Sequence, residues 1–195
     1  MRQAEIKRIT GETEVVVKLN MDGSGMSVID TGIGFFDHML TLFSKHGFCN
    51  LAVECKGDLE VDGHHTVEDV GISLGQAIKE ALGDKAGIVR YGTSFVPMDE
   101  TLVLVSLDIS GRPYLVYDVD AMLTPMIGSY DTELTEEFLR ALCVHAGITL
   151  HVKLIHGKNS HHIVEAVFKA LGRALGEAVQ IDPRIDGVMS TKGML

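Results

Sequence analysis

Residues 64–68 read HHTVE, and residues 161–165 read HHIVE near the other end of the chain. Both segments have the pattern HHxxE, and both begin an amphipathic run. Residues four apart lie on the same face of a helix, so the first His and the Glu of each copy can bind one metal ion together. The second His is rotated by about 100° and is better placed for another ion. Two such copies in one chain of 195 residues predict a metal site.

The residues around the two copies predict the same series of elements twice. Alternating and β-branched residues predict strands, and a period near 3.6 predicts helices. In the first copy we expect strands at 14–20, 26–29 and 51–55 and helices at 35–45 and 64–82. In the second copy we expect strands at 101–109, 113–119 and 148–154 and helices at 133–146 and 164–179. Each half would then contain about three strands and two helices.

The two copies align residue against residue. The aligned pairs include Glu12 with Glu100, Thr13 with Thr101, His38 with Glu137, and His46 with His145. The second copy is longer only between Gly111 and Glu137, and no Pro- or Ser-rich linker separates the copies. We therefore expect an internally duplicated α/β (α+β) protein. Residues 1–195 would form a single domain with halves of about 1–87 and 88–195, each a mixed or antiparallel sheet with two helices on one face.

The composition excludes several classes of protein. Hydrophobic residues make up 46% of the chain and charged residues 23%, which is typical of a globular protein. A net charge of -10 argues against nucleic acid as a partner, although a few local cations can bind a small anion. No apolar run is long enough to span a membrane, and the first residues lack a signal-peptide core. Three scattered cysteines predict reduced thiols, so we expect a cytoplasmic protein.

The alignment of the copies adds His38 and Glu137 to the candidate metal ligands. We assign eight side chains to two ions, one ion taking His64, Glu68, Glu137 and His162 and the other taking His38, His65, His161 and Glu165. The ligands of one site need not come from one chain. Imidazole and carboxylate without thiolate suit Mn, Fe, Co, Ni or Zn. The alternative is a closed structural metal site, or His pairs that only cap helices.

Cations and hydroxyls that suit a bound anion are spread along the chain. The tail at residues 190–193 offers two hydroxyls, a cation and free amides, which together suit a phosphate. Glu12 precedes a predicted strand and is a candidate acid–base group. Each of these residues taken alone would be an ordinary surface residue. The candidate anion contacts are Arg90, Arg112, Lys169, Ser190, Thr191 and Lys192.

Several segments match one known family over nearly the whole chain. They include residues 8–14 (RITGETE), 32–40 (GIGFFDHML), 57–71 (GDLEVDGHHTVEDVG), 107–114 (LDISGRPY), 157–169 (GKNSHHIVEAVFK) and 190–193 (STKG). Paired HHxxE segments with DHML upstream are highly specific. The chain resembles the imidazoleglycerol-phosphate dehydratases of histidine biosynthesis.

This resemblance implies a ribosomal protein S5 domain 2-like fold and a homo-oligomer, a 24-mer built from trimers with sites at subunit interfaces. It also implies two Mn²⁺ ions per site and a small-molecule phosphate substrate. The family's metal ligands fall on His38, His64, His65, Glu68, His161, His162 and Glu165. The acid–base group falls on Glu12, and the substrate contacts are Glu12, His46, Arg90, Arg112, Lys169, Ser190, Thr191 and Lys192. Several members carry His where this chain has Glu137, a hard oxygen donor that suits Mn²⁺.

The implied reaction is a metal-dependent hydro-lyase step that removes water from imidazoleglycerol phosphate and yields imidazole acetol phosphate. The hydrogen that is lost is barely acidic, because no carbonyl adjoins its carbon. An imidazole ring held between two Mn²⁺ ions would instead expel the neighbouring hydroxyl while Glu12 moves the proton. Two other functions use similar residues. One is a dinuclear hydrolase with closely spaced ions, and the other is a non-catalytic metal-binding shell protein, which would have no use for Arg112, Lys192 and Glu12.

Overall fold

The computed structural model describes residues 2–121 and 123–195. The first half has six elements in the order strand, strand, strand, helix, strand, helix. They are β1 (Gln3–Ile9), β2 (Thr13–Asn20), β3 (Ser27–Asp30), α1 (Gly34–Gly47), β4 (Asn50–Gly57) and α2 (His64–Leu82).

The second half has the same order of elements with one insertion. Its elements are β5 (Tyr91–Met98), β6 (Thr101–Asp108), β7 (Tyr114–Asp118), α3 (Leu134–Ala146), β10 (Thr149–His156) and α4 (Ser160–Ala178). A small hairpin of β8 (Met126–Ile127) and β9 (Tyr130–Asp131) lies between β7 and α3. This hairpin occupies the place where the second copy of the sequence is longer.

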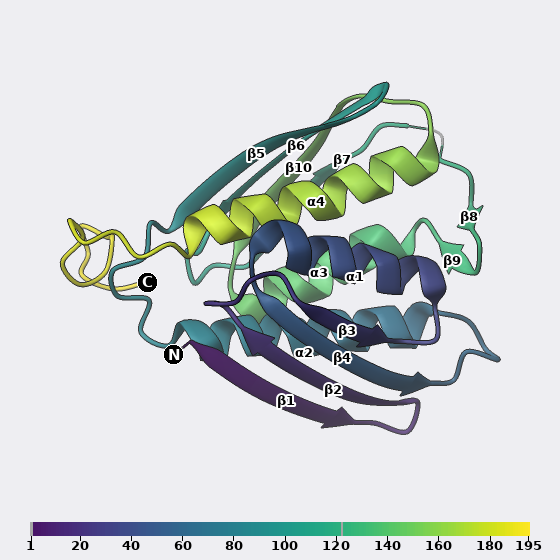
Figure 1. Ribbon diagram of the computed structural model, residues 1–195, viewed down its shortest axis with the longest axis horizontal. Coiled ribbons are helices and arrows are strands. Elements are labelled where there is room, and N and C mark those ends of the chain that lie inside the picture. The colour runs from purple at the N-terminus through teal and green to yellow at the C-terminus, as the bar shows by residue number, and fades with distance from the viewer. Residues whose placement is uncertain (1, 122) are drawn as a thin grey trace.

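Each half forms a four-stranded mixed sheet, and the strand orders are equivalent, β1-β2-β4-β3 and β5-β6-β10-β7. The pairs β3 with β4 and β7 with β10 are parallel, and the other neighbouring strands are antiparallel. The two sheets form the outer layers, and the four helices lie between them (Figure 1). Helix α1 packs against α4, and α2 packs against α3, so each helix contacts the other half. The predicted fold class, a duplicated α/β (α+β) unit, is confirmed.

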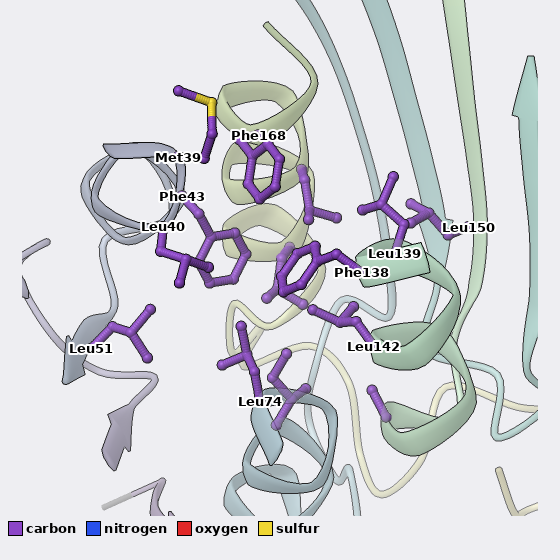
Figure 2. Packing of buried hydrophobic residues seen from close by; sticks show 14 of the residues in the cluster. Met39, Leu40, Phe43, Leu51, Leu74, Phe138, Leu139, Leu142, Leu150 and Phe168 are labelled. Carbon is purple, nitrogen blue, oxygen red and sulfur yellow. The ribbon is translucent and has the colours of Figure 1, made fainter. Parts of the chain in front are cut away.

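The core lies in the helical layer and joins the two halves. The Phe138 ring of α3 contacts the Phe36 ring of α1 and the Phe168 ring of α4, with ring centroids 5.3 Å apart in each pair. Figure 2 shows Phe138 beside Phe168. All three rings are fully buried. The helices approach closely where glycine removes the side chain, because a Cβ on Gly172 would lie 2.5 Å from the Phe43 carbonyl oxygen. This approach brings the start of α4 beside α1.

Besides the short hairpin of β8 and β9, the strands β1 and β5 escaped prediction, so the expectation of three strands per half was wrong. On β1 only Ala4 is buried, since this strand lies at the sheet edge and carries polar residues on both faces. On β5 the buried residues are Gly92, Ser94 and Val96, and large side chains such as Phe95 point outward. The inward positions are small because α4 lies directly against them. A pattern with small or polar residues on the buried face gives little strand signal.

The boundaries of the predicted elements hold to within a few residues, with one larger difference. The helix predicted from residue 164 begins at Ser160, so both histidines of the second pair lie in its first turn. Asn159 caps this helix, and its side chain accepts a hydrogen bond from the His162 amide. The Asn159 cap favours a helix start at Ser160, although the polar residues 158–162 by themselves suggest a loop. Within the described ranges, no helix has the length and apolarity needed to cross a membrane.

Candidate metal centre and active site

Three predicted metal ligands converge where α1 meets the start of α4. His161 and Glu165 lie one turn apart on α4, with His161 Nε2 3.0 Å from Glu165 Oε2. His38 of α1 points to the same carboxylate, and its Nε2 lies 3.5 Å from Glu165 Oε2. One donor atom from each of these residues lies within 4.8 Å of the other two. Two imidazoles and a carboxylate at this spacing fit a first-row divalent cation such as Mn²⁺.

Glu165 is buried, yet it stays ionised. Burial by itself would raise the pKa of this carboxyl group, but hydrogen bonds from Lys169 and His161 outweigh burial and hold the pKa below its usual value. Lys169 Nζ lies 2.6 Å from Glu165 Oε1. The carboxylate is therefore a charged donor, which a hard divalent cation requires.

His64 and Glu137, which we assigned to the other ion, line one cavity of about 1010 Å³. The cavity opens between the start of α2, the start of α3 and the hairpin of β8 and β9. Several further carboxylates line it, so its electrostatic character favours a cation. They are Asp62, Asp131, Glu133 and Glu136. Arg140 Nε lies 4.0 Å from Glu137 Oε1, and it partly balances this charge.

The second histidine of each pair lies beside other carboxylates. His65 Nδ1 lies 3.0 Å from Asp58 Oδ2, and its Nε2 lies 3.6 Å from Glu12 Oε1. His162 Nδ1 lies 2.8 Å from Glu100 Oε2. Among the described residues, the only group of three close donors is His38, His161 and Glu165, so neither His65 nor His162 joins it. The assignment of four ligands to each ion stays a prediction.

The predicted phosphate contacts fall into two places. Arg90 donates to both carboxylate oxygens of Asp108, at 2.7 and 3.0 Å, and to the carbonyl oxygen of Met189 at 2.7 Å. Arg112 is exposed, with Nη2 3.7 Å from Asp108 Oδ2. The tail begins beside these two arginines, and the Lys192 amide donates to Ser190 Oγ. These predicted phosphate contacts therefore gather at one end of the molecule. They are Arg90, Arg112 and the tail residues Ser190, Thr191 and Lys192.

Lys169 and His46 lie elsewhere, near the crossing of α1 and α4. Burial lowers the pKa of His46, and the positive charges of Lys169 and Arg173 lower it further. His46 is therefore neutral at pH 7 and can accept or donate a hydrogen bond.

The match to known proteins agrees with this geometry. The family model described as imidazoleglycerol-phosphate dehydratase matches residues 31–175, which include both HHxxE segments, His38 and Glu137. The chain belongs to the imidazoleglycerol-phosphate dehydratase family. The predicted family resemblance is confirmed.

Relatives within this family match the chain end to end. The imidazoleglycerol-phosphate dehydratase of Acetivibrio thermocellus is 64% identical over 194 residues, covering 100% of this chain and 99% of the relative. That of Clostridium botulinum is 64% identical over 192 residues, covering 98% of this chain and 97% of the relative. Because the matches are full-length, family membership applies to both halves.

Solved structures of the family share the fold. The dehydratase of Staphylococcus aureus superposes with a TM-score of 0.83 at 44% identity, covering 92% of this chain and 99% of that one. The enzyme of Pyrococcus furiosus superposes with a TM-score of 0.84 at 38% identity, covering 97% and 100%. At these identities the likeness extends beyond the fold alone.

Sequence reasoning missed three carboxylates that contact site residues of this family member. Asp58 binds His65, Glu100 binds His162, and Asp108 binds Arg90. Signals for all three were present, because Asp58 and Asp108 lie in the matching segments 57–71 and 107–114 and Glu100 aligns with Glu12 in the repeat. Their roles depend on loop conformation, which periodicity does not encode.

Proposed function

We propose that this chain dehydrates imidazoleglycerol phosphate to imidazole acetol phosphate, as a hydro-lyase of histidine biosynthesis. The observation that carries the proposal is the group of His38, His161 and Glu165, in a chain of the dehydratase family. Such a group binds a divalent cation beside a substrate that itself contains an imidazole. The substrate is a small phosphate ester, and the expected location is the cytoplasm.

We further propose that two Mn²⁺ ions per site are held by the eight predicted ligands. Bound there, they would act as Lewis acids for the imidazole end of the substrate. The ligand set is His38, His64, His65, Glu68, Glu137, His161, His162 and Glu165. Glu137 supplies oxygen where several members carry His, which favours a hard ion such as Mn²⁺.

The proton is moved by Glu12 in this proposal. Its side chain is more than half exposed, and its carboxylate faces His65 Nε2 at 3.6 Å. An accessible carboxylate beside a metal ligand can take a proton from a bound substrate and return it later. The phosphate end is bound by Arg90, Arg112, Lys169, His46 and the tail residues Ser190, Thr191 and Lys192.

Distances within one chain support an active site that is shared between subunits. The Arg90 amide donates to the carbonyl of Ala178 at the end of α4, whereas His161 lies at its start. A helix of 19 residues is about 28 Å long. The tail and the start of α4 lie at opposite ends of the molecule (Figure 1). One small substrate cannot reach both ends, so we infer a homo-oligomer. The family resemblance implies that it is a 24-mer built from trimers.

We also infer that residues 1–195 form one domain with halves of about 1–87 and 88–195. The support is a continuous core, because buried residues of both sheets and all four helices belong to one cluster. Each half would leave an apolar helical face exposed if it were separated from the other.

The test is to mix purified protein with Mn²⁺ and imidazoleglycerol phosphate and to measure the ketone product. We expect ketone without release of inorganic phosphate, and no ketone after metal removal with a chelator. Release of inorganic phosphate without ketone would indicate the dinuclear hydrolase instead. A metal-binding protein that forms neither product would indicate the non-catalytic alternative.

A further inference from the structure

The second histidine of each HH pair makes the same kind of contact in both halves. His65 Nδ1 faces the carboxylate of Asp58 at 3.0 and 3.2 Å. His162 Nδ1 faces the carboxylate of Glu100 at 2.8 Å. An ionised carboxylate can only accept, so in each contact Nδ1 carries the proton. The lone pair of the neutral ring is then on Nε2, the atom that remains available for a metal ion.

The carboxylate comes from a different place in each half, although the halves are equivalent. Glu12 and Glu100 each stand one residue before the equivalent strands β2 and β6. In the second half Glu100 reaches His162 and also accepts the backbone amides of Lys158 and Asn159. Its carboxylate is therefore fully engaged with its own half.

In the first half Asp58 takes this place. The loop from β4 to α2 is longer than the loop from β10 to α4, and Asp58 is its first residue. Lys158 follows Gly157 in the shorter loop as Asp58 follows Gly57, and its cation cannot accept a hydrogen bond from a histidine. Because Asp58 occupies His65 Nδ1, Glu12 faces the other nitrogen, Nε2, at 3.6 Å.

We propose that Asp58 and Glu100 are positioning residues that fix the tautomer and orientation of the metal-binding histidines His65 and His162, and that Asp58 thereby leaves Glu12 free for proton transfer. This inference rests on the proposed function. It explains why two glutamates at equivalent positions have different roles, one catalytic and one positioning. The difference lies in a single loop residue, aspartate at 58 and lysine at 158.

In both contacts the ring N–H of the histidine donates and the carboxylate accepts. Carboxylates that accept from a ligating histidine typically affect metal affinity by about 10- to 100-fold.

The experiment measures Mn²⁺ binding by the full chain from the EPR signal of the free ion. The variants are Asp58→Asn, Glu100→Gln and Glu12→Gln, with Glu54→Gln as a matched control. Glu54 is an exposed glutamate of β4 whose nearest cation is Lys56, at 4.0 Å. We expect Asp58→Asn and Glu100→Gln each to weaken one class of Mn²⁺ sites about 10- to 100-fold. Saturating Mn²⁺ should restore most of their turnover.

Glu12→Gln should behave in the opposite way, with wild-type Mn²⁺ affinity and turnover that is at least about 10²-fold lower and that added Mn²⁺ does not restore. Glu54→Gln should match the wild type in both measurements. Wild-type Mn²⁺ affinity in Asp58→Asn and Glu100→Gln would overturn the inference. Within the part of the chain that the structure describes, the Asp58 side chain makes hydrogen bonds only to His65. Asp58→Asn therefore remains informative if loss of the backbone contacts of Glu100 disturbs folding.

The same data separate this inference from the proposed function. A wild-type chain that binds Mn²⁺ but forms no ketone would contradict the proposed function. The Mn²⁺ affinities of Asp58→Asn and Glu100→Gln would still decide whether these carboxylates orient ligands. A wild-type chain that forms ketone, with variants of unchanged affinity, would end only the inference.

Discussion

Glu165 shows how a single residue is kept ready for a metal ion. It lies in the buried layer between α1 and α4, where a carboxyl group would ordinarily be neutral. Lys169 and His161 on the same helix donate the hydrogen bonds that keep it ionised, and His38 on the neighbouring helix lies 3.5 Å from the carboxylate. A metal ion arriving there replaces part of this compensation and has no proton to displace from the Glu165 carboxylate.

Glu12→Gln tests the acid–base role at the residue scale. The amide keeps the size of the side chain but cannot accept a proton, so turnover should fall by at least about 10²-fold. Folding should be unaffected, because the Glu12 side chain is half exposed and its one nearby charged partner among the described residues is His65. Steady-state rates with saturating Mn²⁺ measure this effect. An active variant would remove Glu12 as the proton carrier.

His162→Ala tests the assignment of ligands to two ions. His162 belongs to the set with His64, Glu68 and Glu137, so its loss should reduce bound manganese by about one ion per site. Elemental analysis after dialysis gives the ratio of metal to chain. Full manganese content in this variant would contradict the two sets, while His151→Ala, a change at an exposed position of β10, should leave the content unchanged.

At the scale of elements, the crossing of α1 and α4 decides whether the metal group forms. His38 comes from α1, whereas His161 and Glu165 come from α4, and no local pattern holds the three donors together. The crossing is close because Gly172 faces the backbone of α1 at Phe43 and Gly47. Helix packing and metal binding therefore depend on the same contact.

Gly172→Ala should disturb both properties. A Cβ there would lie 2.5 Å from the Phe43 carbonyl oxygen, so the helices must move apart. We expect the free energy of unfolding to fall by about 1–3 kcal/mol, and Mn²⁺ affinity to fall with it, as His38 moves away. Denaturant unfolding and Mn²⁺ titration measure the two effects.

Gly34→Ala is the matched control for this change. Its added Cβ would have no neighbour within 4 Å, and the residue also lies in a helix. The free energy of unfolding should stay within about 0.5 kcal/mol of the wild type or rise slightly. Equal destabilisation by both variants would show that the close approach at Gly172 is not what limits the packing.

At the scale of the whole molecule, the three cysteines report on the integrity of the core. All three are free and buried. Burial raises the pKa of Cys49 and of Cys55 to about 11 and that of Cys143 to about 12, from an ordinary value of 9.0. The native chain should therefore resist alkylation at pH 8, and the unfolded chain should react at all three thiols.

Stability should fall as the pH rises above 9. The folded state keeps its thiol protons to a higher pH than the unfolded state does, so the unfolded state binds fewer protons there and gains stability. Each buried thiol contributes about 1.4 kcal/mol per pH unit between the unfolded and folded pKa values. Denaturant unfolding at pH 9 and at pH 10 measures the slope. Cys143→Ala should reduce the slope of the unfolding free energy against pH by about the contribution of one thiol. An unchanged slope would contradict this account.

The sequence by itself determined the duplication, the helices and the chemical class of the site. Hydrophobic periodicity reflects which face of a helix or strand is buried, and neighbouring residues suffice to express it. The repeated HHxxE also placed a His and a Glu on one helical face, and His161 and Glu165 lie as that spacing predicts. The hidden strands β1 and β5 had no such pattern, because one lies at a sheet edge and the other faces α4 with small residues.

Only the tertiary structure decided how the candidate ligands combine. It joined His38 to His161 and Glu165, directed His65 and His162 to Asp58 and Glu100, and separated the arginines from the metal group by the length of α4. These relations connect residues far apart in the chain, and they depend on the closure of a core shared by both halves. Contacts of that kind follow from packing and loop length, which no short window of sequence encodes.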